Sequence, residues 1–277
     1  MEYKRISILG TGSMGKAILS GLVGAGNNPS TIHVTTKSVS SADEISAKYG
    51  VTATSLESNT NANSLCAAGA ELLILAVKPN LILETLQEVA KGLKPESLVI
   101  SVAAGITTSA MEQALGNSSS VIRAMPNTPS VLGLGVTGIA AGSSVSDEQL
   151  EKAIKLFTNV GKVLVVEESK IDALSTISGS GPAYVFYFAE KLITAAKSLG
   201  FSDQEAKLMV NETFLGSATL LANSTHSAEE LRAQVTSPNG TTMQATARFD
   251  AADLEKVFIE ATGAALARAK ELGKVKP

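Results

Sequence analysis

Residues 6–15 have the sequence Ile6-Ser7-Ile8-Leu9-Gly10-Thr11-Gly12-Ser13-Met14-Gly15, in which a short apolar run leads directly into the pattern G-x-G-x-x-G. A helical pattern of apolar residues follows at once, which gives the order strand, glycine turn, helix that the dinucleotide-binding fingerprint requires. Gly10 permits a tight turn, Gly12 lets a pyrophosphate approach the backbone, and Gly15 lets the helix pack on the strand. The helix start offers free N–H groups to phosphates. This stretch predicts a dinucleotide-binding Rossmann domain of the α/β class; the alternative is a glycine-rich turn without a ligand.

The composition restricts the possible partners. The chain has 277 residues, 44% of them hydrophobic, and a formal net charge of −3. This charge gives no electrostatic reason to expect a nucleic acid or an anionic membrane as partner. A single cysteine, Cys66, excludes an internal disulfide framework, and we expect it to be a buried structural thiol. His33 and His226 lie far apart, and no metal-ligand pattern appears. The N-terminus lacks a signal-peptide pattern and no apolar run has membrane-spanning length, so we expect a cytoplasmic protein.

The next predicted strand, residues 32–35, bears on the choice of cofactor. It ends about twenty residues after the glycine turn, where NAD-binding proteins tend to place an acidic residue for the ribose 2′-hydroxyl. This chain has Thr36, Lys37 and Ser38 there instead. Hydroxyls and a cation suit a 2′-phosphate, whereas an acid would repel it. The sequence therefore favours NADP(H), with NAD(H) as a second possibility; a solvated loop with an ordinary surface lysine is the alternative.

Alternating patterns continue the α/β domain to about residue 166. Apolar runs predict strands at 72–77, 98–102, 121–125, 137–141 and 163–166, and amphipathic patterns predict helices at 43–49, 81–93 and 147–159. Residues 55–64 are polar and predict a loop near the ligand cleft. Lys78 follows a buried strand, where a parallel sheet faces its ligand. The small residues Ala103-Ala104-Gly105 leave room for a flat ring, or serve tight packing alone.

The remaining residues predict a helical domain, so we divide the chain into domains at 1–166 and 167–277. A break at 178–182 starts a helix, Ser202 with Glu205 and Ser227 with Glu230 predict capping boxes, and Asp250 predicts the cap of a last helix that runs to about residue 272. Many small residues on these helices leave broad apolar faces that a short domain would not bury alone. We expect a dimer through this domain; a self-contained bundle is the alternative.

Residues 235–242 join two of these helices with the sequence Val-Thr-Ser-Pro-Asn-Gly-Thr-Thr. The stretch offers several hydroxyls and a Pro-Asn-Gly turn that opens a helix at about Thr241. A helix start with free N–H groups and flanking hydroxyls suits a carboxylate. An N-cap turn with exposed threonines explains the pattern equally well.

Taken together, these stretches resemble pyrroline-5-carboxylate reductases over essentially the whole chain. The last two of the motifs that carry the resemblance are highly specific in their order and spacing, and the full set is Gly10-x-Gly12-x-Met14-Gly15, Ala76-Val77-Lys78-Pro79, Ala103-Ala104-Gly105, Arg123-x-Met125-Pro126-Asn127-Thr128-Pro129, Ser178-Gly179-Ser180-Gly181-Pro182-Ala183-Tyr184 and Ser237-Pro238-Asn239-Gly240-Thr241-Thr242. The resemblance implies a Rossmann domain, a C-terminal helical domain that forms a homodimer and often decamers, and NAD(P)H-dependent reduction of 1-pyrroline-5-carboxylate to L-proline.

The resemblance also implies site residues. By position, the cofactor contacts fall on Thr11, Ser13, Met14, Thr36, Asn63, Val77, Lys78 and Ala104. The substrate carboxylate falls on Ser237 and the backbone N–H groups of Gly240 and Thr241, and the catalytic contact to the ring nitrogen falls on the Thr242 hydroxyl. The chain departs from the family by having Asn239 where glycine is usual. Because asparagine tolerates a left-handed backbone, we expect the loop to keep its shape.

Two other functions remain open from the sequence. A β-hydroxyacid dehydrogenase would also join a Rossmann domain to helices, but it would need a lysine acid, for which Lys191 and Lys197 are the nearest candidates. A protein that binds NADP(H) as a sensor would bind the cofactor without turnover. Hydride addition to a cyclic iminium needs little acid–base chemistry, which agrees with the absence of a histidine or carboxylate constellation in the sequence.

Overall fold

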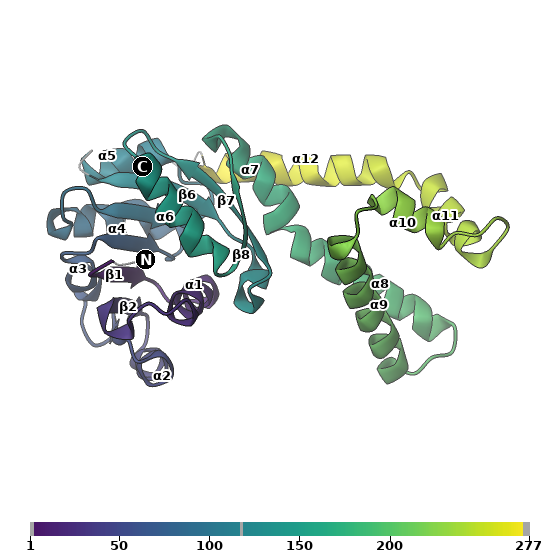
Figure 1. The fold of residues 1–277 in the computed structure, drawn as a ribbon, viewed down its shortest axis with the longest axis horizontal. Coiled ribbons are helices and arrows are strands. Elements are labelled where there is room, and N and C mark those ends of the chain that lie inside the picture. Colours follow the sequence, from purple (N-terminus) through teal and green to yellow (C-terminus); the bar gives the residue numbers. More distant parts are fainter. Residues whose placement is uncertain (1–2, 117–118, 274–277) are drawn as a thin grey trace. The chain divides into compact units, whose positions relative to one another are not determined.

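A computed structural model describes residues 3–116 and 119–273 of the chain. These residues contain one sheet with the strand order β3-β2-β1-β4-β5-β6-β7-β8 (Figure 1). The strands are β1 (Ile6–Leu9), β2 (Ile32–Thr36), β3 (Thr52–Ser55), β4 (Leu72–Leu75), β5 (Leu98–Ser101), β6 (Ser120–Met125), β7 (Gly135–Ala141) and β8 (Gly161–Val165). Strands β1 to β6 are parallel to one another, whereas β7 is antiparallel to β6 and parallel to β8. This topology confirms the predicted α/β class.

Helices cover both faces of the sheet. On one face α1 (Ser13–Gly24), α2 (Val39–Tyr49) and α6 (Asp147–Thr158) contribute to a buried apolar cluster, and on the other α3 (Ala62–Ala67), α4 (Ile82–Val89) and α5 (Thr108–Leu115) do so. Alternate strand residues supply the two clusters: Ile8 belongs to the first and Leu9 to the second. Double coverage explains why the strands have continuous apolar sequences.

Short helical turns and a helical C-terminal part complete the described chain. The 3-10 turns are Pro29–Thr31, Pro79–Leu81, Ala90–Gly92, Thr128–Leu132 and Glu168–Lys170, and a π-helical turn spans Ser175–Gly179. The later helices are α7 (Ile171–Leu174), α8 (Gly181–Ser198), α9 (Asp203–Asn223), α10 (Ala228–Gln234), α11 (Thr241–Ala251) and α12 (Leu254–Gly273). Both predicted capping boxes are confirmed, at the starts of α9 and α10.

Two local predictions were wrong. Residues 55–64 are not a continuous loop, because β3 ends at Ser55 and α3 begins at Ala62. Strand β3 is too polar to show in the sequence, and its place is set by parallel pairing with β2. Asp250 does not cap the last helix, because it lies in the last turn of α11. The chain turns three residues later, where Asp253 Oδ1 accepts a hydrogen bond from Lys256 N–H at 3.4 Å.

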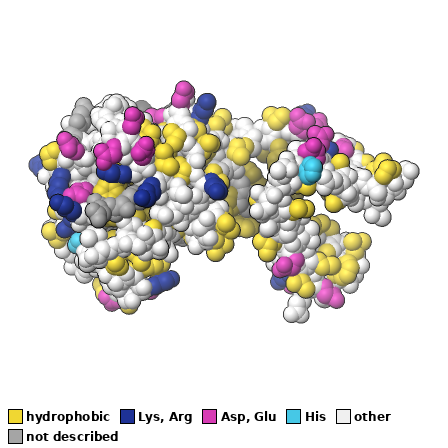
Figure 2. Space-filling model, in the orientation of Figure 1, with side chains coloured by type: hydrophobic (Ala, Val, Ile, Leu, Met, Phe, Trp, Pro, Cys, Tyr) yellow, Lys and Arg dark blue, Asp and Glu magenta, His cyan; other side chains and the backbone are white. Residues whose placement is uncertain are grey.

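The chain forms two compact units, one of Met1–Ser180 with Ala265–Pro277 and the other of Gly181–Ala264. In the second unit α8 packs against α9, yet large apolar side chains remain exposed, such as Phe186 at 67% and Leu215 at 61%. Figure 2 shows hydrophobic side chains on the surface of these helices. Among the described residues, no helix is both long enough and apolar enough to cross a bilayer.

Candidate active site

The glycine turn after β1 has the geometry that the fingerprint predicts. Gly10 has a φ of +86°, and a Cβ added at Gly15 would lie 2.2 Å from the Gly10 carbonyl oxygen, so the start of α1 packs directly on the turn. A Cβ at Gly12 would meet nothing within 4 Å. Helix α1 begins after Gly12 without a side-chain cap and without an acidic residue in its first turn. Its first N–H groups are therefore available to an anion such as a pyrophosphate.

Thr35 holds this turn in place and was missed by the sequence analysis. Its Oγ1 accepts a hydrogen bond from Gly10 N–H at 3.1 Å and donates one to Asn63 Oδ1 at 3.0 Å. Its carbonyl oxygen accepts hydrogen bonds from the Thr11 hydroxyl at 2.9 Å and from Thr11 N–H at 3.1 Å. The Asn63 side chain is thereby placed beside the glycine turn. A buried threonine within an apolar strand was the only sequence signal for this role.

Parallel pairing brings the other predicted cofactor residues to the same edge of the sheet. Leu9 is paired with Thr35 of β2 and with Leu75 of β4, and Leu75 is paired with Ser101 of β5. Thr36 ends β2, Lys37 and Ser38 follow it, Val77 and Lys78 follow β4, and Ala104 follows β5. They flank β1 at the point where the chain order of the strands reverses, which is where doubly wound sheets bind their ligands.

The corner at the end of β2 contains a carboxylate that the sequence analysis did not foresee. Thr36 Oγ1 donates to the Ser38 carbonyl at 2.8 Å, and the Ser38 hydroxyl caps α2 by accepting from Ser41 N–H at 3.4 Å. Lys37 is exposed. Glu57, which follows β3, accepts a hydrogen bond from Val39 N–H through Oε2 at 3.0 Å. Thus the corner presents hydroxyls, one lysine and one glutamate.

A cavity of about 280 Å³ in the first unit borders Ala104 and Gly105, two of the small residues that were predicted to leave room for a flat ring. Arg123 of β6 also lines it, and its side chain is only 4% exposed. Arg123 Nη2 donates to Asp172 Oδ1 at 2.5 Å, and Nη1 lies 3.9 Å from Glu168 Oε1. The carboxylate of Glu168 in turn accepts from Thr108 N–H at 2.6 Å and from its hydroxyl at 2.8 Å. Arg123 therefore links β6 to α7 in the wall of this cavity.

The predicted substrate residues lie in the second unit, at the start of α11. Gly240 N–H donates to the Ser237 carbonyl at 3.0 Å, which closes the turn, and Asn239 has the left-handed φ of +58° that we expected to be tolerated. The first helical hydrogen bond runs from Gln244 N–H to the Gly240 carbonyl, so the N–H groups of Thr241 and Thr242 have no acceptor within the helix. No residue of the first turn is acidic, and no side chain caps the helix.

The hydroxyls around this helix start are also free. Within the part of the chain that the structure describes, the side chains of Ser237, Thr241 and Thr242 have no hydrogen-bond partner, whereas the neighbouring Thr236 and Thr246 donate to backbone carbonyls. Gly240 is packed too closely for a side chain, because an added Cβ would lie 2.7 Å from Ser237 Oγ. The arrangement supplies donors, and no negative charge, to a small anion.

The contacts of the other side chains considered for catalysis show no catalytic role for them. The ammonium groups of Lys191 and Lys197 are exposed and paired with Glu190 at 2.7 Å and with Asp203 at 3.0 Å. Cys66 is buried, as predicted, and burial raises the pKa of its thiol to about 11. Burial lowers the pKa of His33, with a smaller contribution from Arg5. None of these groups forms part of the two helix starts described above.

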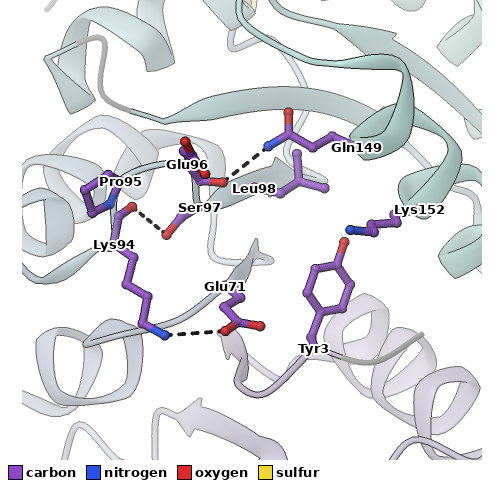
Figure 3. A pocket seen from close by; sticks show the side chains of 9 residues that line it. All are labelled: Tyr3, Glu71, Lys94, Pro95, Glu96, Ser97, Leu98, Gln149 and Lys152. Carbon is purple, nitrogen blue, oxygen red and sulfur yellow. Dashed lines mark hydrogen bonds and ion pairs between the residues drawn. The ribbon is translucent and has the colours of Figure 1, made fainter.

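A pocket of about 320 Å³ lies at the opposite edge of the sheet, where β4 and β5 begin (Figure 3). Both of its lysines are already paired: Lys94 with Glu71 at 3.4 Å, and Lys152 with Glu148 at 2.7 Å. Burial, followed by the charges of Glu148 and Glu71, raises the pKa of Tyr3 to about 12. The amino edge of the sheet is thus separate from the glycine turn, which lies at the carboxyl edge.

Comparisons with known proteins find relatives over nearly the whole chain. The family described as "Pyrroline-5-carboxylate reductase dimerisation" matches residues 168–272, and the family described as "NADP oxidoreductase coenzyme F420-dependent" matches residues 5–105. A pyrroline-5-carboxylate reductase of Corynebacterium melassecola is 39% identical over 97% of this chain and 98% of its own length.

Solved structures agree with the sequence relatives. A pyrroline-5-carboxylate reductase from Coxiella burnetii is 38% identical, covers 99% of this chain and 100% of its own, and has a TM-score of 0.91. The pyrroline carboxylate reductase of Plasmodium falciparum, solved with NADP bound, is 25% identical with the same coverage and has a TM-score of 0.85. Similarity therefore extends over both units.

Proposed function

This chain belongs to the pyrroline-5-carboxylate reductase family and reduces 1-pyrroline-5-carboxylate to L-proline, the last step of proline biosynthesis, and we propose that NADPH is its preferred hydride donor. The main support for the site is a pair of helices, α1 and α11, that begin after a glycine with neither a side-chain cap nor an acidic first turn. One start suits the cofactor's pyrophosphate and the other suits the substrate's carboxylate.

The cofactor site uses the carboxyl edge of the sheet. The residues that we assign to it are Gly10, Thr11, Gly12, Ser13, Met14, Gly15, Thr36, Lys37, Ser38, Asn63, Val77, Lys78 and Ala104. The open space at Gly12 and the uncapped α1 fit a pyrophosphate. Lys37 and the hydroxyls beside it attract a 2′-phosphate, and the cavity beside Ala104 leaves space for the nicotinamide. NADPH bound there supplies the hydride.

The substrate site uses the start of α11. We assign the carboxylate to Ser237 and Thr241, with Gly240 as the tight turn that places their donors. Because the Gly240 N–H already closes the turn, the free donors are the N–H groups of Thr241 and Thr242 and the Ser237 hydroxyl. The Thr242 hydroxyl, which has no partner among the described residues, contacts the ring nitrogen and fixes the orientation of the imine.

Catalysis in this proposal consists mainly of orientation. The substrate is a cyclic imine, and its protonated form accepts a hydride at the imine carbon to give the secondary amine of proline, so that the C=N π bond is lost and a C–H bond forms. The anchored carboxylate and the Thr242 contact at the ring nitrogen together hold the imine carbon where the hydride is delivered. Thr242 also supplies or relays the proton of that nitrogen.

The assay that tests this function follows the oxidation of NADPH in the presence of 1-pyrroline-5-carboxylate, with L-proline measured as the product. We expect turnover with this substrate and none with small β-hydroxyacids in the reverse direction. Binding of NADPH without turnover would favour the sensor, and turnover of a β-hydroxyacid would favour the dehydrogenase. The exposed, ion-paired state of Lys191 and Lys197 argues against that dehydrogenase, because neither lysine is placed as a buried acid.

We predict that Lys37→Asp reverses the preference for NADPH. The substitution removes the cation assigned to the 2′-phosphate and puts an acid where NAD-binding proteins have one, so kcat/KM with NADPH should fall about tenfold or more while the value with NADH is kept or rises. Steady-state kinetics with both cofactors measure this. A cofactor ratio that is equal in the wild type and the variant would show that Lys37 does not contact the cofactor.

We also propose how the chain is organised and assembled. The boundary between the cofactor-binding domain and the helical domain lies between residues 166 and 167. A family match that begins at residue 168 supports this position. The exposed apolar helices of the second unit form a homodimer, which the matched family's name and the exposure of Phe186 and Leu215 support. In this proposal the dimers assemble further into decamers. We place the protein in the cytoplasm, where it needs neither a nucleic acid nor a membrane as partner.

A further inference from the structure

A carboxylate lies at the β2 corner, to which we assign the 2′-phosphate of NADPH. Glu57 Oε2 accepts a hydrogen bond from Val39 N–H, the first residue of α2, at 3.0 Å. The backbone of Glu57 is fixed at the same corner, because its N–H donates to the Lys37 carbonyl at 3.2 Å. Thus Glu57 and Lys37, the residue assigned to the 2′-phosphate, lie side by side although they follow different strands, β3 and β2.

We propose that Glu57 is a specificity-determining residue that weakens the preference for NADPH and so lets the enzyme use both cofactors; this inference rests on the proposed function of the β2 corner. A carboxylate accepts hydrogen bonds from the 2′-hydroxyl of NADH and repels the 2′-phosphate of NADPH. Lys37 has the opposite effect. The ratio of kcat/KM with NADPH to kcat/KM with NADH therefore depends on the balance between attraction of the 2′-phosphate by Lys37 and its repulsion by Glu57.

The contacts of Glu57 explain why the preference for NADPH is weakened and why NADPH is still accepted. The side chain is exposed, and its described contact is a single hydrogen bond to a backbone N–H. It can therefore turn into solvent without uncovering an apolar surface. When it does so, Val39 N–H and the positive end of α2 become available to the phosphate, to which the hydroxyl groups of Thr36 and Ser38 are adjacent. The phosphate thus has to displace a carboxylate from a helix start.

The test uses two fragments of the cofactor that differ only in the 2′-phosphate. Dissociation constants of adenosine 2′,5′-bisphosphate and of 5′-AMP are measured by calorimetry on the full chain and on Glu57→Gln. The glutamine is close in shape but carries no charge, so we expect the bisphosphate to bind about tenfold more tightly, a change that corresponds to ~1.4 kcal/mol. The affinity for 5′-AMP should stay within about threefold, and the NADPH/NADH ratio of kcat/KM should rise by a similar factor to the bisphosphate affinity.

The matched control is Glu88→Gln, which changes the net charge equally. Glu88 is an exposed carboxylate on α4 that accepts from Ser64 Oγ at 2.9 Å, on the other face of the sheet. We expect the bisphosphate affinity of this variant to equal that of the wild type. Glu57→Ser, which also removes the charge, should reproduce the effect of Glu57→Gln.

Two results would overturn the inference: an unchanged or weaker bisphosphate affinity in both Glu57 variants, or an equal gain in Glu88→Gln. Neither measurement involves pyrroline-5-carboxylate. A failure here therefore leaves the reductase function in place, whereas the absence of turnover with that substrate would overturn the function and not this inference.

Discussion

Replacement of Thr242 by alanine should slow the reduction of 1-pyrroline-5-carboxylate roughly ten- to a thousandfold, by the usual size of a proton-transfer or positioning contact. The hydroxyl of Thr242 stands on the first turn of α11, half-buried and without a partner among the described residues. Because it has no structural hydrogen bond to lose, the fold should be preserved and the loss should appear in kcat. Steady-state kinetics with saturating NADPH measure it.

Two variants identify the cause of that loss. Thr242→Ser keeps the hydroxyl and should be much milder than Thr242→Ala. Thr246→Ala is the matched control one turn further along α11, where the hydroxyl donates to the Met243 carbonyl at 3.2 Å. It removes the same atoms from the same helix and should leave kcat within about twofold of the wild type. A fully active Thr242→Ala enzyme would remove Thr242 from the mechanism.

The parts of the fold that depend on near neighbours in the chain were predictable from the sequence. The capping boxes at Ser202 and Ser227 each join residues three positions apart, so their pattern is visible in any short window. The glycine turn is equally local: Gly10 needs its positive φ, and Gly15 must pack against the carbonyl only five residues earlier. Because each of these signals lies within a short window of sequence, these two helix starts and the glycine turn were predicted correctly.

The features that were missed depend on residues far apart in the sequence. Glu57 is hydrogen-bonded to Val39, 18 positions away, and Arg123 to Asp172, 49 positions away. Neither pair has a local pattern, because the contact arises only when β3 pairs beside β2 or when α7 packs near β6. Asp250 illustrates the converse error, since an acceptable local cap was overridden when α11 continued through it. The sequence thus predicts the loops of the site better than the charges that surround them.

The largest effect on stability is expected at Arg123, whose replacement by methionine should lower the free energy of unfolding by about 3–5 kcal/mol. The guanidinium is almost fully buried, and methionine fills a similar volume but leaves the carboxylates of Asp172 and Glu168 without their cation. Arg123 Nε is also buried and lacks a hydrogen-bond partner within the described residues, so its desolvation is tolerated only because the two carboxylates compensate for it. Denaturant unfolding, followed at one fixed protein concentration, measures the change.

Lys152→Met is the matched control for this loss, because it breaks an exposed ion pair four residues apart with Glu148 and should cost far less stability than Arg123→Met. The double variant Arg123→Met with Asp172→Leu removes both partners of the buried pair. It should regain part of the stability lost in Arg123→Met, since an uncompensated carboxylate is worse than an apolar contact. Equal losses in the single and double variants would mean that the arginine stabilises the wall of the cavity by packing rather than by its charge.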